Sequence, residues 1–364
     1  MKKIMLVFGT RPEAIKMCPL VNELRSRKGV NTLVCVTGQH RQMLDSVLGV
    51  FGVTPDFDLC IMKENQTLFD ITASILLGIR SVLEKAHPDV VLVHGDTSTT
   101  FATALACFYL KIPVGHIEAG LRTYDIYSPY PEEFNRCATS IVTKYHFAPT
   151  ELARENLIKE GKEKNSIFVT GNTAIDALAT TVRPDYTHPE LEWANGSKLV
   201  LLTAHRRENQ GTPMRGMFRA IRRVLDEHPE VKVIYPIHLN PAVRQAASEE
   251  LASSSRLHII EPLEVLDFHN FLSRSFMVLT DSGGIQEEAP ALGKPVLVMR
   301  DTTERPEGVK AGTLKLVGTG EEAIYGNFKR LLEDEHSYNL MAKAANPYGD
   351  GKASKRIADI LTGE

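Results

Sequence analysis

The segment FMVLTDSGGIQEE, residues 276–288, shows how this chain builds its fold. Residues 276–280 form an apolar run typical of a strand buried on both faces. The turn at 282–284, SGG, offers main-chain N–H groups at the predicted start of a helix, which favours a bound anion. Glu287 and Glu288 follow at once and would repel an anion. The segment therefore predicts a strand–turn–helix unit whose ligand is anionic at one end and rich in hydroxyl groups at the other.

The same strand-then-helix pattern recurs along the whole chain. Apolar runs predict strands at 4–8, 33–37, 90–93, 114–117, 145–148, 167–170, 198–203, 232–236, 257–260, 277–280 and 296–299. Amphipathic segments such as 14–26, 67–86 and 99–110 predict helices between them. Continuous apolar strands that alternate with helices indicate parallel sheets covered on both faces.

The length of the chain, 364 residues, exceeds the usual size of one hydrophobic core. A break near Gly171 separates two such series of strands. We therefore predict an α/β protein with two Rossmann-like doubly wound domains, 1–170 and 171–350. In such sheets, ligands bind beyond the carboxyl ends of the strands, so we expect the active site in a cleft between the domains.

The composition argues against several classes of protein. A net charge of −3 gives no basic surface for nucleic acid or an anionic membrane, and no apolar run approaches the roughly 20 residues of a membrane span. The apolar run at the start ends at residues 10–13, too early for a signal peptide. The five cysteines are scattered without a CxxC pair, and the 12 histidines show no metal-ligand spacing. We expect a cytoplasmic protein without a metal.

Basic residues follow the first predicted strand. Arg11 and Lys16 lie at the start of a predicted helix, where a cation works against the helix dipole. They could form a solvated face, as basic residues commonly do. A bound anion would explain Arg11 better.

Three carboxylates lie where elements of the first half end or begin. Asp96 follows the strand at 90–93, and it could simply cap the next helix. Glu118 follows the strand at 114–117, where either Arg122 neutralises it or it faces a cleft. Glu132 could serve the dipole of a helix that starts at Pro131. Together they predict a cluster in which carboxylates raise one another's pKa, as acid–base catalysis requires.

The second half contributes candidates of a different kind. His205 follows the strand at 198–203 beside two arginines, and we expect it to face the cleft. His238 is a weaker candidate for the site, because the Asn-Pro pair that follows it closely is mainly a turn signal. Glu288 can accept hydrogen bonds from ribose hydroxyls while the SGG turn holds a diphosphate, although two glycines also suit a tight turn. Arg305, in MRDTTERPE, adds positive charge nearby. The inferred ligand is a nucleoside diphosphate attached to a further group.

With these residues assembled, the chain resembles the non-hydrolysing UDP-N-acetylglucosamine 2-epimerases. The matching motifs are FGTRPEAIK (8–16), TGQHRQML (37–44), HGDTSTT (94–100), HIEAGLRT (116–123), PEEFNR (131–136), TAHRREN (203–209), HLNP (238–241) and TDSGGIQEEAPALGKPVLVMRDTTERPE (280–307). They follow one another in order along nearly the whole chain.

The resemblance implies a glycosyltransferase-B-like pair of Rossmann-like domains, a homodimer, and a final helix near 351–362 that packs back on the first domain. It implies that UDP-GlcNAc and UDP-ManNAc interconvert without NAD or a metal, through elimination of UDP to 2-acetamidoglucal and its re-addition. The product would supply ManNAc units for cell-surface polysaccharide.

The resemblance also implies roles for individual residues. The catalytic candidates are Asp96, Glu118, Glu132 and His205, with Asp96 and Glu132 as the favoured proton-transfer pair. The substrate-binding candidates are Asp96, Glu118 and His205 again, with Arg11, Lys16, Leu263, Phe268, Ser282, Gly283, Gly284, Glu288 and Arg305. Leu263 stands where some relatives have glutamine, a change that a main-chain contact to uracil would tolerate.

Bacterial relatives have an activator pocket for a second UDP-GlcNAc, and Gln39, Gln42 and His238 match its motif. Asn65 departs from the pattern, because some relatives have a basic residue there. Three alternatives stay open: a hydrolysing epimerase that releases UDP and ManNAc, a glycosyltransferase, and a nucleotide-sugar sensor without turnover. The carboxylate cluster disfavours the sensor, since recognition of an anion alone would avoid such charge.

Overall fold

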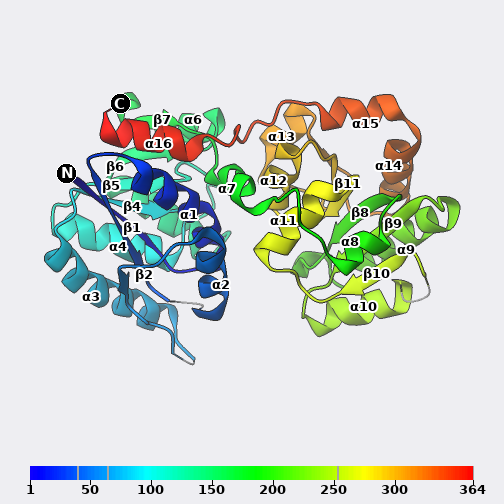
Figure 1. Cartoon of the computed structure of the whole chain (residues 1–364), viewed down its shortest axis with the longest axis horizontal. Helices are drawn as coiled ribbons and strands as arrows, with labels where there is room; N and C mark the ends of the chain where they lie inside the picture. Colours follow the sequence, from blue (N-terminus) through cyan, green and yellow to red (C-terminus); the bar gives the residue numbers. More distant parts are fainter. Residues whose placement is uncertain (39–40, 64, 252–253, 364) are drawn as a thin grey trace. The chain divides into compact units, whose positions relative to one another are not determined.

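The computed structural model describes residues 1–38, 41–63, 65–251 and 254–363. The chain forms two compact units (Figure 1). Unit 1 comprises Met1–Thr180 with Tyr348–Glu364, and unit 2 comprises Thr181–Pro347. Each unit is an α/β domain with one parallel sheet, so the predicted fold class of two doubly wound domains is confirmed.

The sheet of unit 1 has the strand order β3-β2-β1-β4-β5-β6-β7. Its strands are β1 Lys2–Phe8, β2 Val30–Val36, β3 Phe57–Asp58, β4 Val90–His94, β5 Val114–Ile117, β6 Thr143–Ala148 and β7 Ile167–Val169. Every neighbouring pair is parallel. The central strands are apolar without interruption because helices cover both of their faces: Met5 and Val7 of β1 pack in one buried cluster with Val91 and Val93 of β4.

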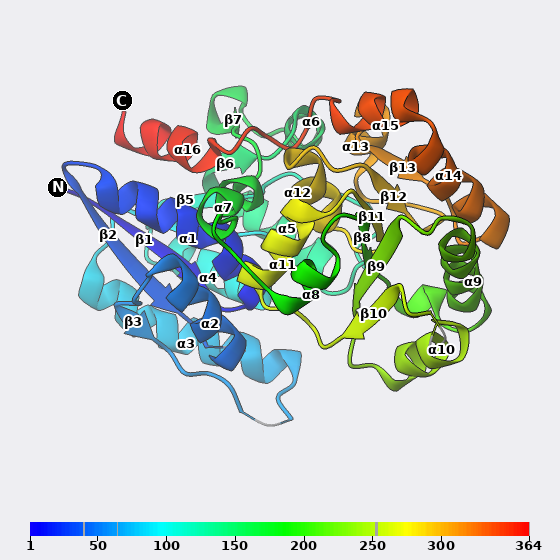
Figure 2. The same cartoon turned by 45° about the vertical axis from the view of Figure 1, so that its right-hand side comes forward.

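The helices of unit 1 are α1 Arg11–Ser26, α2 Arg41–Phe51, α3 Leu68–Ala86, α4 Ser98–Tyr109, α5 Glu132–Val142, α6 Glu151–Lys159, α7 Thr173–Thr181 and α16 Ala353–Thr362, with the short 3₁₀ turn η1 Lys164–Ser166. The C-terminal helix α16 lies beside α1, the first helix of the chain (Figures 1 and 2). Lys2 Nζ donates to the carbonyl of Leu361 at 2.6 Å, and Arg27 pairs with Asp359 at 2.6 Å.

The boundary between the units lies at residues 180/181, ten residues beyond the expected position at 170/171. Helix α7 belongs to unit 1 because its Asp176 carboxylate accepts hydrogen bonds from the N–H groups of Ala353 and Ser354. The N–H of Asn172 also donates to the carbonyl of Tyr348 at 2.7 Å. The returning C-terminal segment therefore anchors α7 to unit 1, an interaction between residues far apart in the sequence.

The sheet of unit 2 has the strand order β10-β9-β8-β11-β12-β13, again with parallel neighbours. Its strands are β8 Lys198–Thr203, β9 Val231–Pro236, β10 Leu257–Ile260, β11 Met277–Thr280, β12 Val296–Val298 and β13 Leu314–Leu316. Its helices are α8 Pro189–Trp193, α9 Thr212–Glu227, α10 Pro241–Leu251, α11 Val265–Arg274, α12 Ile285–Ala291, α13 Pro306–Ala311, α14 Glu321–Glu333 and α15 Glu335–Ala342, with the 3₁₀ turn η2 Arg207–Asn209. Buried clusters on both faces of β8 and β11 form its core.

Two strands were not predicted, β3 with two residues and β13 with three. Strands this short carry no periodic signal, and each lies at an edge of its sheet. In the described ranges, none of the helices is long and apolar enough to cross a membrane.

We expect Gly9→Ala to destabilise the protein by at least about 2 kcal/mol, because the backbone after β1 lies against two buried side chains. A Cβ at Gly9 would lie 1.9 Å from Thr37 Oγ1 and 2.8 Å from Thr99 Oγ1. Gly49 of α2 is the matched control: it is exposed with open space around it, so Gly49→Ala should stabilise by about 0.5 kcal/mol. Urea unfolding measures both, and equal stabilities would contradict the predicted contact.

Candidate active site

Polar segments follow the central strands of both sheets, where the strand order reverses. In unit 1, β1 pairs with β2 on one side and with β4 on the other. In unit 2, β8 pairs with β9 and with β11 in the same way. Ligands of open α/β sheets bind beyond the carboxyl ends of strands at such reversals. The predicted site residues therefore form two groups, one in each unit.

Glu118 is the first residue after β5, and its φ of 62° is unusual for a residue other than glycine. Its carboxylate Oε2 lies 2.5 Å from Lys16 Nζ of α1 and 2.9 Å from His94 Nε2 at the end of β4. The side chain is only 9% exposed. The structure thus brings Lys16 and Glu118 together as a buried ion pair. Arg122, the partner considered from sequence, pairs instead with Glu160 at 2.6 Å, so that interpretation is wrong.

The pKa of Glu118 reflects these partners. Burial by itself would raise it, but the charge of Lys16 and then the contact with His94 outweigh burial and hold the pKa well below its usual range. Glu118 is therefore an ionised carboxylate at neutral pH. It can stabilise positive charge, but it is poorly suited to carry a proton.

The pKa of Asp96 is shifted in the opposite direction, upward. Its side chain is 27% exposed and forms an ion pair with Arg136 of α5. Burial raises its pKa; Arg136 opposes this, while the negative charges of Glu118 and Glu132 raise the pKa further. Capping was considered for Asp96 and for the hydroxyl residues that follow it. The cap is Thr97, whose side chain accepts the N–H of Thr100, so capping is confirmed for a hydroxyl residue and is wrong for Asp96. Asp96 is left available for proton transfer.

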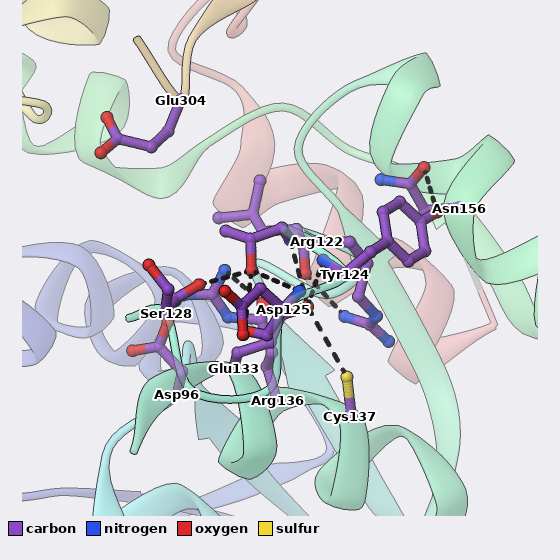
Figure 3. A network of polar contacts seen from close by, with 12 residues as sticks. Asp96, Arg122, Tyr124, Asp125, Ser128, Glu133, Arg136, Cys137, Asn156 and Glu304 are labelled. Carbon is purple, nitrogen blue, oxygen red and sulfur yellow. Dashed lines mark hydrogen bonds and ion pairs between the residues drawn. The ribbon is translucent and has the colours of Figure 1, made fainter. Parts of the chain in front are cut away.

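Glu132 and Glu133 are adjacent, yet they differ in their surroundings. Glu132 is half-buried at the start of α5, and its side chain has no ion-pair or hydrogen-bond partner in the part of the chain that the structure describes. Glu133 is buried, and its Oε1 accepts the N–H groups of Thr123 and Tyr124 at 3.1 and 3.0 Å (Figure 3). Glu133 therefore anchors a loop, whereas Glu132 is free to act on a ligand.

The start of α1 is arranged in a similar way. Glu13 is buried in a capping box, accepting the N–H groups of Gly9 at 3.0 Å and Thr10 at 2.8 Å. Arg11 is half-buried and has no ion-pair partner among the described residues. A cation without a counter-ion at a helix start fits the anion that its position predicts.

In unit 2, the buried carboxylate of Asp281 joins the ends of β8 and β11. Its Oδ2 accepts the N–H groups of His205 and Arg206, both at 2.8 Å, and the side-chain amide of Asn209 at 3.2 Å. Sequence reasoning assigned Asp281 no role. The only sequence signal for such a role was the position of this acid, between an apolar strand and the SGG turn.

The ring of His205 is 37% exposed and stacks on the ring of His238, with centroids 5.4 Å apart. Burial lowers the pKa of His205, Asp281 opposes that effect, and His238 adds to it. His205 is therefore mainly neutral near pH 7. The structure brings the expected catalytic histidine into contact with a histidine of the expected activator motif.

The SGG turn precedes α12, and backbone N–H groups here lack a hydrogen-bond acceptor among the described residues. The N–H of Ser282 donates to Thr280 Oγ1 at 2.9 Å. The following N–H groups, of Gly283, Gly284 and Ile285, have no hydrogen-bond partner within the described ranges. Three consecutive free donors at this point can bind the oxygens of a phosphate group.

The charged residues beside this turn are largely paired. Arg305 forms an ion pair with the buried Glu287, so the charge expected to contact a nucleotide is matched within the protein. Glu288 is 15% exposed, and its Oε2 lies 3.6 Å from His269 Nε2. Arg206, which sequence reasoning left out, lies against Gly283 and donates through Nε to the carbonyl of Asp281 at 3.3 Å.

The other candidates are placed only in part. Leu263 and Phe268 are half-buried against the apolar cluster of unit 2. Gln39 lies outside the described residues, and Gln42 belongs to α2, although its side chain is not described. Within the described ranges, no three His, Cys, Asp or Glu side chains group as metal ligands.

Comparisons with known proteins identify the family of the chain. Residues 22–362 match the family described as UDP-N-acetylglucosamine 2-epimerase. The chain is 61% identical over 359 residues to the UDP-N-acetylglucosamine 2-epimerase of Bacillus subtilis strain 168, covering 99% of this chain and 94% of that protein. It is 50% identical to the Escherichia coli K12 enzyme of the same name, covering 99% and 98%. The crystal structure of UDP-GlcNAc 2-epimerase from Neisseria meningitidis bound to UDP-GlcNAc superposes with a TM-score of 0.89, at 49% identity and full coverage of both chains.

We expect Lys16→Met to destabilise the protein by about 3 kcal/mol at pH 7, because it leaves the buried Glu118 carboxylate with only His94 beside it. The double variant Lys16→Met/Glu118→Gln removes that charge and should recover much of the loss. Arg80→Met, which breaks an exposed ion pair with Glu84, is the control and should leave stability unchanged. Urea unfolding measures all three, and a double variant no more stable than Lys16→Met would contradict the charge-burial argument.

Proposed function

Because the chain belongs to the UDP-N-acetylglucosamine 2-epimerase family, we propose that it interconverts UDP-GlcNAc and UDP-ManNAc by inverting C2. One observation supports this proposal most strongly. Asp96 and Glu118 follow neighbouring strands, yet their pKa values are shifted in opposite directions. Two carboxylates with separated pKa values are what a reaction needs when it both stabilises a cation and moves a proton.

The route is elimination of UDP followed by its re-addition. The C2–H bond is not acidic, since the carbon that bears the N-acetyl group has no adjacent carbonyl. As the C1–O bond to the diphosphate breaks, C1 gains oxocarbenium character and the C2 proton becomes acidic. Loss of that proton forms the C1=C2 bond of 2-acetamidoglucal. Delivery of a proton to the opposite face of C2, with return of UDP to C1, completes the inversion without NAD or a metal.

The three carboxylates of unit 1, Asp96, Glu118 and Glu132, have different roles in this reaction. Asp96, with its raised pKa, and Glu132, with its free side chain, transfer the protons at C2. Glu118 stays ionised and stabilises positive charge on the sugar ring in the transition state. This assignment keeps the proton-transfer pair that the family motifs imply, and it makes Glu118 an electrostatic group.

Unit 2 holds the nucleotide. The free N–H groups of Gly283, Gly284 and Ile285 bind the diphosphate, and Glu288 accepts hydrogen bonds from the ribose hydroxyls. Leu263 and Phe268 contact the uracil. His205, mainly neutral near pH 7, donates a hydrogen bond to the departing diphosphate. Arg11 and Lys16 of unit 1 add positive charge for the same group.

A second UDP-GlcNAc activates the enzyme at a site that includes Gln39, Gln42 and His238. The enzyme acts in the cytoplasm and supplies ManNAc units for cell-surface polysaccharide.

A homodimer is the expected assembly. Its candidate surface lies on unit 1, where Leu77 of α3 and Phe108 and Tyr109 of α4 are exposed. A cavity of about 350 Å³ between α3 and α4 includes Leu77 and Tyr109 in its lining. An exposed apolar surface of this kind is common at interfaces between subunits.

The proposed function is tested by incubating the protein with UDP-GlcNAc in D₂O and following C2 by NMR. We expect UDP-ManNAc to form with deuterium at C2. Asp96→Asn and Glu132→Gln should each lower this exchange by about 10²-fold or more, because each removes a proton-transfer group. Retention of C2 exchange in both variants would contradict the assigned pair.

The same incubation, followed by mass analysis, identifies the product. In the product of the proposed reaction, the diphosphate is attached to the sugar. Free ManNAc with UDP would indicate the hydrolysing reaction, and transfer of the sugar to an acceptor would indicate a glycosyltransferase. Binding of UDP-GlcNAc without any turnover would indicate a sensor.

A further inference from the structure

We propose that Arg136 is a positioning residue of this reaction, which aims the carboxylate of Asp96 and keeps it able to release its proton. The proposal rests on the proposed function, in which Asp96 carries a proton at C2. Neither the sequence motifs nor the comparisons assign a role to Arg136.

Arg136 bridges two carboxylates (Figure 3). One terminal nitrogen forms an ion pair with Asp96 Oδ2, and the other lies 3.2 Å from Glu133 Oε2. The Arg136 side chain is 12% exposed and that of Glu133 is buried. Because Glu133 also accepts two backbone N–H groups, it is a fixed partner against which the guanidinium plane is oriented. The planar fork therefore sets the direction of the Asp96 carboxylate.

The loop that carries Asp96 is held independently of Arg136. Asn135 Nδ2 donates to the carbonyl of Asp96 at 2.8 Å. His116 Nε2 lies 2.6 Å from the carbonyl of Gly95, and burial lowers the pKa of His116 to about 3, so a neutral ring donates this bond. Loss of Arg136 would therefore release the Asp96 carboxylate while its backbone stays in place.

The charges around Asp96 show what that release would do. Arg136 is its positive neighbour, and two glutamates oppose it: Glu132 from α5 and Glu118 from the end of β5. Glu118 is itself backed by Lys16 of α1 and by His94 of β4. Without Arg136, burial and the two glutamates act unopposed, so the pKa of Asp96 rises further and the carboxyl group stays protonated up to a higher pH.

This consequence separates a positioning role from a merely structural one. When the C2–H bond breaks, the proton must pass to an ionised carboxylate. A protonated Asp96 cannot accept it, so a higher pKa of Asp96 lowers turnover at neutral pH, and turnover returns as the pH is raised. A variant that is only destabilised or misfolded would lose activity at every pH.

The test compares Arg136→Gln with Arg136→Lys and with a matched control. Arg27, at the C-terminal end of α1, also bridges two carboxylates, those of Glu23 and Asp359, at 2.6 Å each. Its side chain is 16% exposed, close to the value for Arg136. Arg27→Gln thus removes an equivalent pair of contacts in the same unit, away from Asp96.

Two measurements are made on each protein. The first is a ¹³C NMR titration of protein labelled at the aspartate carboxyl carbons, in which the Asp96 signal is assigned by its loss in Asp96→Asn. The second is the pH profile of kcat and KM for deuterium exchange at C2. We expect the Asp96 titration to move up by about one pH unit or more in Arg136→Gln, which lowers the ratio of ionised to protonated Asp96 about tenfold. In that variant kcat should fall at pH 7 and recover at higher pH, with KM within about twofold.

Arg136→Lys keeps the charge but loses the fork, so its Asp96 titration should stay near that of the wild type while kcat falls. Arg136→Lys also tests the positioning role if Arg136→Gln does not fold. A kcat of Arg136→Lys equal to that of the wild type would overturn the positioning role. An unmoved Asp96 titration in a folded Arg136→Gln, or the same displacement in Arg27→Gln, would overturn it as well.

The NMR titration needs no turnover, which keeps the two proposals distinguishable. A wild-type protein that leaves UDP-GlcNAc unchanged would contradict the proposed function. The Asp96 titration in the two Arg136 variants would still show whether this arginine controls the carboxylate.

Discussion

A carboxylate at the end of a buried parallel strand must be paired, hydrogen-bonded or protonated, because burial penalises its charge. This constraint organises both units. Glu118 is paired with Lys16, Asp281 accepts two backbone N–H groups and an amide, and Glu133 holds a loop while it contacts an arginine. Asp96 meets the constraint only in part, since burial and two glutamates outweigh its single arginine. Of these four carboxylates, Asp96 is therefore the one whose incomplete neutralisation leaves its pKa raised.

The strands and the fold class were predictable because hydrophobic pattern alone specifies them. The long apolar runs became β1, β8 and β11, and their carboxyl ends are where the polar segments lie. Candidates such as Asp96, Glu118 and His205 could be named for the same reason, since each follows a strand that the pattern predicts. The edge strands β3 and β13 were not predicted, because each has only two or three residues. The boundary at 180/181 was not predicted either, because it depends on contacts of α7 with the C-terminal segment.

Sequence could not assign partners to charges. Arg122 was a reasonable partner for Glu118 because it is four residues away, yet it pairs with Glu160 from another element. Arg305 was expected to bind a ligand, but the buried Glu287 matches its charge. Glu132 and Glu133 are chemically identical neighbours, and only the fold shows that one faces inward to hold Thr123 and Tyr124. Pairing depends on distances between segments that are remote in sequence, which local pattern does not contain.

The packing of α16 against α1 has a consequence for how the molecule is made. Unit 2 is one continuous stretch, so all of it is synthesised before the last helix. Unit 1 combines residues from early and late in the sequence. The hydrogen bond of Lys2 with Leu361 and the ion pair of Arg27 with Asp359 can form only after the later residues have been synthesised. Unit 1 is therefore the last of the two units to be completed, although its first strand is translated first.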